Sequence, residues 1–283
     1  YGPAQFVGRV EDNLLTECSG MDISMTNKDI LWAINAGGHG PYLYALTPDG
    51  GSVGRVLIKG ASNRDWEAID TFFWQGRAMI LIADFGDNFQ VYNSHTLYVV
   101  EEPEISIEKK TGPISVPVAW RIHFSYPGAK HDAESAAVDA QKGKVLVLTK
   151  RDTPPLLYEV PLRPSETASA VVAEKIAAVD QLKAPQNGFF HTKYDHQPTA
   201  MDVSADGTRV VVLTYTNAHL FTLNGSDSWR TGFRTRPILI RLPHPQERME
   251  FRQREAIFFG PDNKTIFVSS EGEGAGIFRL DPR

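Results

Sequence analysis

Residues 63–70 carry the sequence NRDWEAID, and residues 82–88, one turn later, carry IADFGDN. Polar and acidic residues lead into a strand of small and apolar residues that ends in aspartate. A turn, a second strand and a second polar loop follow. Shorter versions of the first part recur at intervals of roughly 50 to 70 residues: ECSGMD (17–22), DAESAAVD (132–139), QPTAMD (197–202) and QREAIF (253–258). Five copies predict a fold that repeats one unit radially or along a solenoid.

Each repeat predicts a small antiparallel sheet. Short β-rich runs alternate with turns such as NKD (27–29) and PDGG (48–51), and no segment shows an extended 3.6-residue apolar period. The first four repeats supply four strands each. The last strand of the third repeat, residues 169–178, is alanine-rich and is also consistent with a short helix. The fifth repeat supplies three strands.

The missing strand of the fifth repeat decides the architecture. An unpaired sheet edge promotes aggregation, and residues 5–10 (QFVGRV), which echo VGRV at 53–56, offer a strand to cover it. We therefore predict an all-β fold: a β-propeller of five four-stranded blades, forming a single domain over residues 1–283. The N-terminal strand closes the last blade. The alternative is a six-bladed ring with a degenerate blade in residues 179–196 or 224–252.

The composition narrows the function classes. A net charge of −5 over 283 residues argues against a nucleic-acid partner, which requires a basic face. No apolar run approaches the roughly 20 residues of a membrane helix. The single cysteine, Cys18, excludes an internal disulfide and leaves the compartment undecided. Because the chain starts at Tyr1, we expect a removed leader or a trimmed chain, and a periplasmic or secreted protein. We expect a monomer that binds a small molecule or another envelope protein.

Polar residues of the repeats are expected to gather at one end of the central channel. In a propeller the innermost strand of each blade lines the channel. The loop leading into that strand opens on the same face as the loop between the second and third strands. Most side chains of these loops are acidic, and crowded carboxylates repel one another unless a cation neutralises them or some hold a proton. The candidate metal ligands are Glu17, Asp65, Glu67, Asp84, Asn88, Glu134 and Glu255.

The donor types favour a hard cation. Carboxylate and amide oxygens are the ligands that Ca²⁺ prefers, and they also suit Mg²⁺. Zinc is disfavoured because no His or Cys pair has ligand spacing. The alternative is that these side chains are solvated and cap turns, with an Asx turn at Asp87 and Asn88. Further candidate ligand-binding residues are Asn35, His39, Lys150, Arg151, His196 and Glu271.

His131 and Glu134 are the candidate catalytic residues. A histidine beside a carboxylate can act as a general base near neutral pH, although a surface histidine bonded to a loop is the alternative. Lys150 and Arg151 are equally consistent with binding phosphate or carboxylate and with neutralising Glu134 and Asp152. The sequence has no nucleophile elbow, phosphate-binding loop or dinucleotide fingerprint.

The motifs DWEAI, ADFGDN, DAES, TAMDVSADG and EAIF together resemble a group of bacterial, often exported β-propeller proteins. That group is similar in blade style to phytase-like propellers with proposed esterase activity and, more distantly, to the gluconolactonase and paraoxonase group. The resemblance spans Glu17 to Leu280. It implies a Ca²⁺ site on one face at Glu17, Asp65, Glu67, Glu134 and Glu255. Two features depart from the pattern: those enzymes usually have six blades, and the fourth repeat has Gln197 and Thr199 where an acid is expected.

Three functions are consistent with this sequence. The most specific is a metal-dependent hydrolase of a small ester or phosphoester, in which Ca²⁺ polarises the scissile oxygen and His131 or a carboxylate activates water. The second is glycoside hydrolysis by a pair of carboxylates among Asp65, Glu134 and Glu255. The third is a non-enzymatic propeller whose acidic mouth binds a ligand or a protein. Fold likeness does not choose among them.

Overall fold

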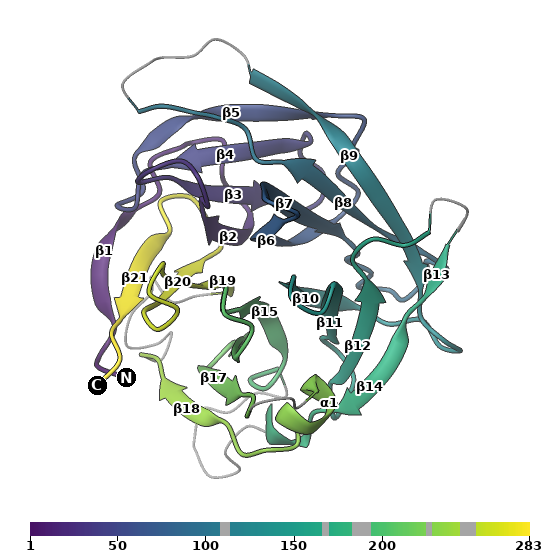
Figure 1. Cartoon of the computed structure of the whole chain (residues 1–283). Helices are drawn as coiled ribbons and strands as arrows, with labels where there is room; N and C mark the ends of the chain where they lie inside the picture. The colour runs from purple at the N-terminus through teal and green to yellow at the C-terminus, as the bar shows by residue number, and fades with distance from the viewer. Residues whose placement is uncertain (108–113, 166–169, 183–193, 225–227, 244–252) are drawn as a thin grey trace.

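The structure is a computed structural model that describes residues 1–107, 114–165, 170–182, 194–224, 228–243 and 253–283. These residues form an all-β fold in which sheets are arranged in a ring around a common centre (Figure 1). The innermost strands are β2 (Cys18–Ile23), β6 (Trp66–Trp74), β10 (Ala133–Asp139), β15 (Pro198–Val203) and β19 (Arg254–Phe259). Each of these strands contacts the next one, and β19 contacts β2, so the inner ring is closed.

The first two repeats form one continuous sheet. Strands β2 to β5 pair antiparallel in chain order, as do β6 to β9, and a parallel pairing of β5 with β9 joins the two halves. The short strand β13 (Val171–Val172) pairs with the part of β9 that does not pair with β5. The remaining strands of this sheet are β3 (Leu31–Asn35), β4 (Tyr42–Leu46), β5 (Ser52–Lys59), β7 (Arg77–Asp84), β8 (His95–Glu101) and β9 (Ile114–Ser125).

The third and fourth repeats each form a separate four-stranded sheet, β10-β11-β12-β14 and β15-β16-β17-β18. A 3₁₀ turn, η1 (Asp180–Leu182), follows the first of them, and a one-turn helix, α1 (Trp229–Gly232), precedes β18. The outer strands are β11 (Lys144–Thr149), β12 (Leu156–Pro161), β14 (Glu174–Ala178), β16 (Arg209–Thr214), β17 (Asn217–Thr222) and β18 (Ile238–Arg241). None of the helices in the described part of the chain is long and apolar enough to cross a membrane.

The two ends of the chain share the last sheet. Strands β20 (Ile266–Ser270) and β21 (Gly276–Leu280) follow β19, and β1 (Gln5–Arg9) pairs antiparallel with β21 on the outside. The rings of Phe6 and Phe278 meet edge-on at 5.6 Å across this pair. Figure 1 shows the two termini side by side. The predicted closure by an N-terminal strand is therefore present.

Apolar side chains fill the gaps between neighbouring sheets. Trp32 and Trp66 are fully buried between the halves of the large sheet, and Phe124 packs toward Ala133 and Tyr158 of the next. Because the core is divided among these gaps, each sheet is held by both of its neighbours.

Two alternatives from the sequence can be compared with this topology. Residues 171–178 form strands β13 and β14, so the helical alternative is wrong for that part, while residue 169 lies outside the described residues. Of the segments considered for a sixth blade, the described portions contain only η1, the turn at residues 194–196 that precedes β15, α1, and β18, which completes an existing sheet. No additional four-stranded sheet occurs among the described residues.

Candidate functional site

Every innermost strand has a β-bulge at the same place. The register with the second strand of the sheet shifts between Trp66 and Ala68, and equivalent shifts occur in the other four inner strands. A bulge leaves one residue unpaired and re-aims its side chain, which is why bulges are frequent beside active sites. The residues skipped by the register are Ser19, Glu67, Glu134, Thr199 and Glu255. We call these five residues the bulge ring.

The bulge ring lies in the channel. Ser19, Glu67 and Glu255 line one small cavity of about 10 Å³, which is the volume of roughly one water molecule. The three glutamates are each 5–8% exposed. Ser19 donates a 2.6 Å hydrogen bond to the carbonyl of Trp66, whereas Thr199 Oγ1 and Glu134 Oε2 are buried without a partner. Both atoms are shielded from solvent, so their hydrogen-bonding capacity is unused inside the ring.

Lys150 is a cation in direct contact with the ring. It follows β11, and its ammonium is ion-paired with Glu134 Oε1, with both side chains buried. Burial alone would lower the pKa of Lys150, but the carboxylates of Glu134 and Glu255 outweigh it and raise that pKa. One ammonium thus faces three glutamates, and it cannot balance them all.

The uncompensated charge raises the pKa values of the glutamates. Burial, followed by the charges of Glu134 and Asp65, raises the pKa of Glu67 well above its usual range. Burial and Glu134 do the same for Glu255. Glu134 has a pKa of about 7, because burial raises it while Lys150 opposes the rise. At neutral pH the ring therefore holds protons as well as negative charge, and its members differ in proton affinity.

Asp65 and Tyr215 extend the ring toward the mouth. Asp65 Oδ1 accepts a 3.2 Å hydrogen bond from Gly37, and burial raises the pKa of Asp65. A Cβ atom at Gly86 would lie closer than 3.0 Å to carboxylate oxygens of both Asp65 and Glu67. The glycine of the DFGDN motif is therefore needed for this close approach and not for a left-handed turn. Across the channel, Tyr215 lies with its ring 5.2 Å from the Lys150 ammonium and its hydroxyl 3.5 Å from Glu255.

The rest of the DFGDN loop holds other loops in place. Asp84 accepts a 2.8 Å hydrogen bond from the backbone of Asp65, and Asp87 accepts bonds from the amides of Val91 and Tyr92. The Asn88 side chain accepts from Arg151, whose Nε also donates to Asp132 at 2.7 Å. Asp84, Asn88 and Arg151 thus bond to protein groups of neighbouring loops, and none of the three belongs to the bulge ring.

The described contacts of His131 are with residues other than Glu134. Its Nδ1 atom lies 2.9 Å from Asp152 Oδ2, and its Nε2 atom lies 3.1 Å from the hydroxyl of Tyr158. The ring also packs edge-on against Tyr126 at 5.0 Å. Both imidazole nitrogens have partners in an aromatic cluster between two sheets, and the Glu134 carboxylate is instead paired with Lys150.

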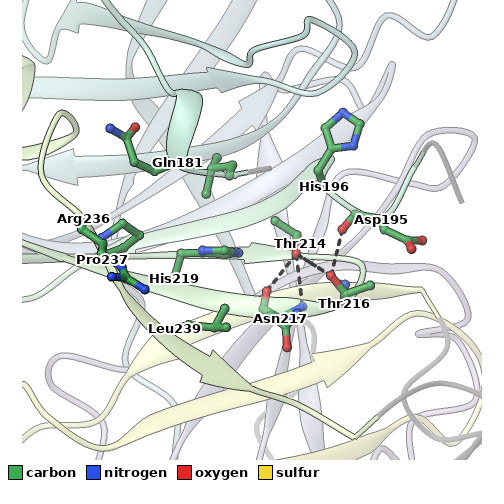
Figure 2. Close-up of a pocket in the computed structure, with 11 residues that line it drawn as sticks. Gln181, Asp195, His196, Thr214, Thr216, Asn217, His219, Arg236, Pro237 and Leu239 are labelled. Atoms are coloured by element: carbon green, nitrogen blue, oxygen red, sulfur yellow. Dashed lines mark hydrogen bonds between the residues drawn. The ribbon is translucent and has the colours of Figure 1, made fainter. Parts of the chain in front are cut away.

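The remaining predicted residues lie around the mouth or beyond it. Glu17 is half-exposed, 3.6 Å from His39, and Glu271 has a pKa raised by burial and by Glu17. Asn35 is buried, donating to the Leu14 carbonyl and accepting from the Glu17 amide. His196 lines a separate cavity (Figure 2). The equivalents of Glu67 in the first and fourth repeats are Ser19 and Thr199, not Glu17 and Gln197.

The residues of the bulge ring meet only some of the requirements of a metal site. Hard oxygen donors are the right type for Ca²⁺, but among the described residues no group of three or more His, Cys, Asp or Glu side chains is placed to hold a metal. Lys150 supplies positive charge at this point of the channel. Ca²⁺ or Mg²⁺ at the ring accordingly stays a prediction.

The fold and the ring define a β-propeller-like protein with an acidic channel site. No protein-family model matches the chain, and no curated protein matches it. Among solved structures, it is similar to a luciferin-regenerating enzyme (TM-score 0.52, 10% identity, 99% of this chain and 96% of that one). It also matches the nidogen/laminin complex (0.47, 10%, 94% and 76%). A Bacteroides uniformis candidate 6-phosphogluconolactonase matches as well (0.43, 12%, 94% and 67%). At these identities the likeness concerns the fold alone.

Proposed function

We propose that the bulge ring is the catalytic site of a hydrolase acting on a small ester or phosphoester. The observation that supports this most is the meeting of Glu67, Glu134 and Glu255 around Lys150. Carboxyl groups with different proton affinities in one site are the arrangement that acid–base catalysis requires. A protonated Glu67 would donate its proton to the leaving oxygen. An ionised Glu134 would take a proton from the attacking water, and Lys150 would attract the anionic oxygen of the substrate.

The size of the site limits what can enter. Each ring glutamate is less than a tenth exposed, and the cavity between Glu67 and Glu255 has the volume of about one water. The scissile group would therefore approach from the mouth, past Asp65 and Tyr215. His131 would support the site through Asp152 and Tyr158 and would not touch the substrate.

A second candidate is a non-enzymatic propeller that binds a cation at the ring. The excess of carboxylates over the single ammonium favours it, because a bound cation would relieve the repulsion that now raises the pKa values. The cation would be Ca²⁺, Mg²⁺ or the ammonium group of a ligand or partner protein.

Thermal unfolding with Ca²⁺, Mg²⁺ or methylammonium distinguishes the two candidates when it is combined with substrate assays. A ligand that binds only the folded chain raises the melting temperature by mass action. Under the cation-binding candidate, Glu255→Gln should remove the shift, and the exposed Glu101→Gln should keep it. Under the hydrolase proposal, turnover of a chromogenic ester or phosphoester should fall in Glu67→Gln whether or not cations shift the curve. Inertness of the wild type on both substrate classes would contradict the hydrolase proposal.

We also propose that the ring has five blades and that the protein is exported. Treating β2–β5 and β6–β9 as separate blades gives five, which agrees with one bulge in each of the five inner strands. Export to the periplasm or beyond stays a prediction, and fractionation of the source cells tests it.

A further inference from the structure

A second cavity lies at the end of the channel away from the bulge ring. It is bordered by residues near the C-terminal ends of all five innermost strands, which surround the centre of the ring (Figure 1), and by the turns that follow them. Its volume is about 420 Å³. A cavity of about 150 Å³ holds benzene, so this one has room for a larger molecule such as a two-ring compound. No residue of the bulge ring lines it.

The wall of this cavity is mostly apolar. Phe72 and Phe259 are buried and contribute part of their surface, whereas Phe73 is 51% exposed. The other apolar lining residues are Ile23, Met25, Val138, Ala140, Val203, Ala205 and Pro261. An exposed aromatic side chain beside an apolar cavity is typical of a surface that binds a ligand. A suitable ligand therefore has an apolar body.

The ionisable residues that line the cavity in the described part of the chain are all acidic: Asp22, Asp139 and Asp202. Asp139 already has partners that balance its charge. Its Oδ2 atom is ion-paired with the ammonium of Lys142 at 2.9 Å and accepts a 2.8 Å hydrogen bond from the indole of Trp229. The charge of this cavity therefore depends on the other two carboxyl groups.

Asp22 and Asp202 have no basic partner among the described residues. Each accepts a 2.6 Å hydrogen bond from a backbone N–H of a neighbouring innermost strand, and neither forms an ion pair there. Burial raises the pKa of both groups, and the charge of Glu102 adds to the rise at Asp22, as that of Asp22 does at Asp202. The main groups that oppose this rise are hydrogen-bond donors. A positive charge in the cavity would stabilise the ionised carboxylates.

The charges of the cavity argue against two other ligand classes. An anion would face carboxyl groups, and the neighbouring basic side chains of Lys142 and Arg209 do not line the cavity. Arg209 instead donates to the carbonyl of Asn263 at 2.8 Å. A metal ion would need several converging ligands, and no such group of three acidic, His or Cys side chains occurs in the part of the chain that the structure describes. A positive charge on an apolar body meets both features of the wall.

We propose that this cavity binds an organic cation, a protonated amine carried on an apolar body of one or two rings. The ammonium group faces Asp22 and Asp202, and the body packs against Phe73 and the apolar wall around it. The ring of Phe73 also attracts a nearby cation through its quadrupole. Binding at this site is independent of the chemistry of the bulge ring.

Isothermal titration calorimetry on the full chain tests the proposal with three probes of similar shape. At neutral pH 1-naphthylmethylamine is a cation, 1-naphthalenemethanol is uncharged and 1-naphthoate is an anion. The amine should bind about tenfold more tightly than the alcohol or better, and the anion should bind more weakly than the alcohol. Asp22, with a pKa of about 7, loses its proton between pH 5 and pH 8. The affinity for the amine should therefore rise over this range, while the affinity for the alcohol stays constant.

Removal of one charge tests the role of the carboxyl groups. Asp202→Asn keeps an acceptor for the Phe259 N–H, so the variant should fold. It should weaken binding of the amine about tenfold and leave binding of the alcohol unchanged. Asp29→Asn is the control, because Asp29 is an exposed acid in the turn after β2 that does not line the cavity. Asparagine tolerates its φ of 55°, and this variant should bind both probes like the wild type.

A second pair of variants locates the site. Ala205 is exposed and lines the cavity, so Ala205→Trp places a large ring at its opening and should abolish binding of both the amine and the alcohol. Ala129 is also exposed but does not line the cavity, so Ala129→Trp should leave binding unchanged.

Four results would overturn the proposal. The first is that the amine does not bind, and the second is that the alcohol binds as tightly as the amine. The third is that binding survives Ala205→Trp in a folded variant. The fourth is that Glu255→Gln abolishes binding of the amine while Asp202→Asn keeps it, which would place the ammonium group at the bulge ring. The first three results leave the hydrolase proposal intact, because neither Asp202→Asn nor Ala205→Trp alters the ring.

Discussion

The carboxylate of Asp70 accepts a 2.6 Å hydrogen bond from the backbone N–H of Val138, and this contact ties one innermost strand to the next. The same link recurs from Asp22 to Thr71 and from Asp202 to Phe259, each at 2.6 Å. The aspartate that ends three of the sequence repeats thus bridges neighbouring innermost strands near the end of the channel away from the bulge ring. Burial raises the pKa values of all three carboxyls. Repulsion from other bridging aspartates adds to the rise at Asp70 and Asp202, and repulsion from Glu102 adds to it at Asp22.

The bridging aspartates should make the protein less stable as pH rises. Burial raises the pKa of Asp22 from 3.8 to about 7, so the folded chain binds the proton more tightly than the unfolded chain. Stabilisation from this proton is complete below pH 3.8 and is lost as pH rises toward 7. Asp22→Asn keeps an acceptor for Thr71 without the charge. Relative to the wild type, its free energy of unfolding should therefore increase between pH 4 and pH 8.

Urea denaturation at several pH values measures this difference. Asp49→Asn is the control, because Asp49 is exposed and its hydrogen bond with Thr47 lowers its pKa, so the substitution should show no such gain. A flat difference for Asp22→Asn across the range would show that Asp22 ionises normally. Asp70→Ala should instead destabilise by about 1–3 kcal/mol, since it leaves the Val138 N–H buried and unpaired.

The closure of the ring by β1 can be tested at a single glycine. A Cβ atom at Gly8 would lie closer than 3.0 Å to the backbone of Asp49, so alanine there must displace β1 or the turn after β4. Gly8→Ala should cost about 1–3 kcal/mol. At Gly54 a Cβ would meet only Ile105, at 3.7 Å, so Gly54→Ala should be close to neutral. Deleting residues 1–10 should cause a larger loss of stability or solubility, and a deletion variant that melts like the full chain would contradict the closure.

The pairing of Lys150 with Glu134 predicts a strong coupling in a double-mutant cycle. Lys150→Met leaves a buried carboxylate without its partner and should destabilise by about 3–5 kcal/mol at pH 8. The loss should be smaller at pH 5, because Glu134, with a pKa of about 7, is then protonated. Glu134→Gln combined with Lys150→Met should restore part of the stability. Additive effects of the two changes, measured by urea denaturation, would show that the pair does not interact.

The fold was predictable because its signal is repeated. Turns and the unpaired last repeat lie in local sequence, and the N-terminal strand expected at residues 5–10 is observed as β1 (Gln5–Arg9). The parallel pairing of β5 with β9 was not predictable, because it joins two repeats through residues that have no motif.

The site was predictable only in part. Glu67, Glu134 and Glu255 stand at the same place in their motifs, so sequence alone brings them together. Ser19 and Thr199 belong to the ring because they occupy the bulge positions of their strands. The position of a bulge depends on strand register, and the residue types alone do not reveal it. Aligning the repeats on Glu67 would have found both. Tyr215 had no signal in the sequence, because it reaches the ring from a loop outside the motif.

The final prediction separates acid–base catalysis at the ring from a role for His131. In assays on carboxyl-ester, phosphoester, lactone and glycoside substrates, Glu67→Gln should lower kcat by about 10²–10⁴-fold, the usual contribution of a positioned proton donor. His131→Ala should mainly lower stability, because its ring bonds Asp152 and Tyr158 and is packed against Tyr126. Melting temperatures of both variants separate the two effects. If His131→Ala keeps its melting temperature but loses turnover as far as Glu67→Gln does, His131 belongs to the catalytic residues and the assignment to the ring alone is wrong.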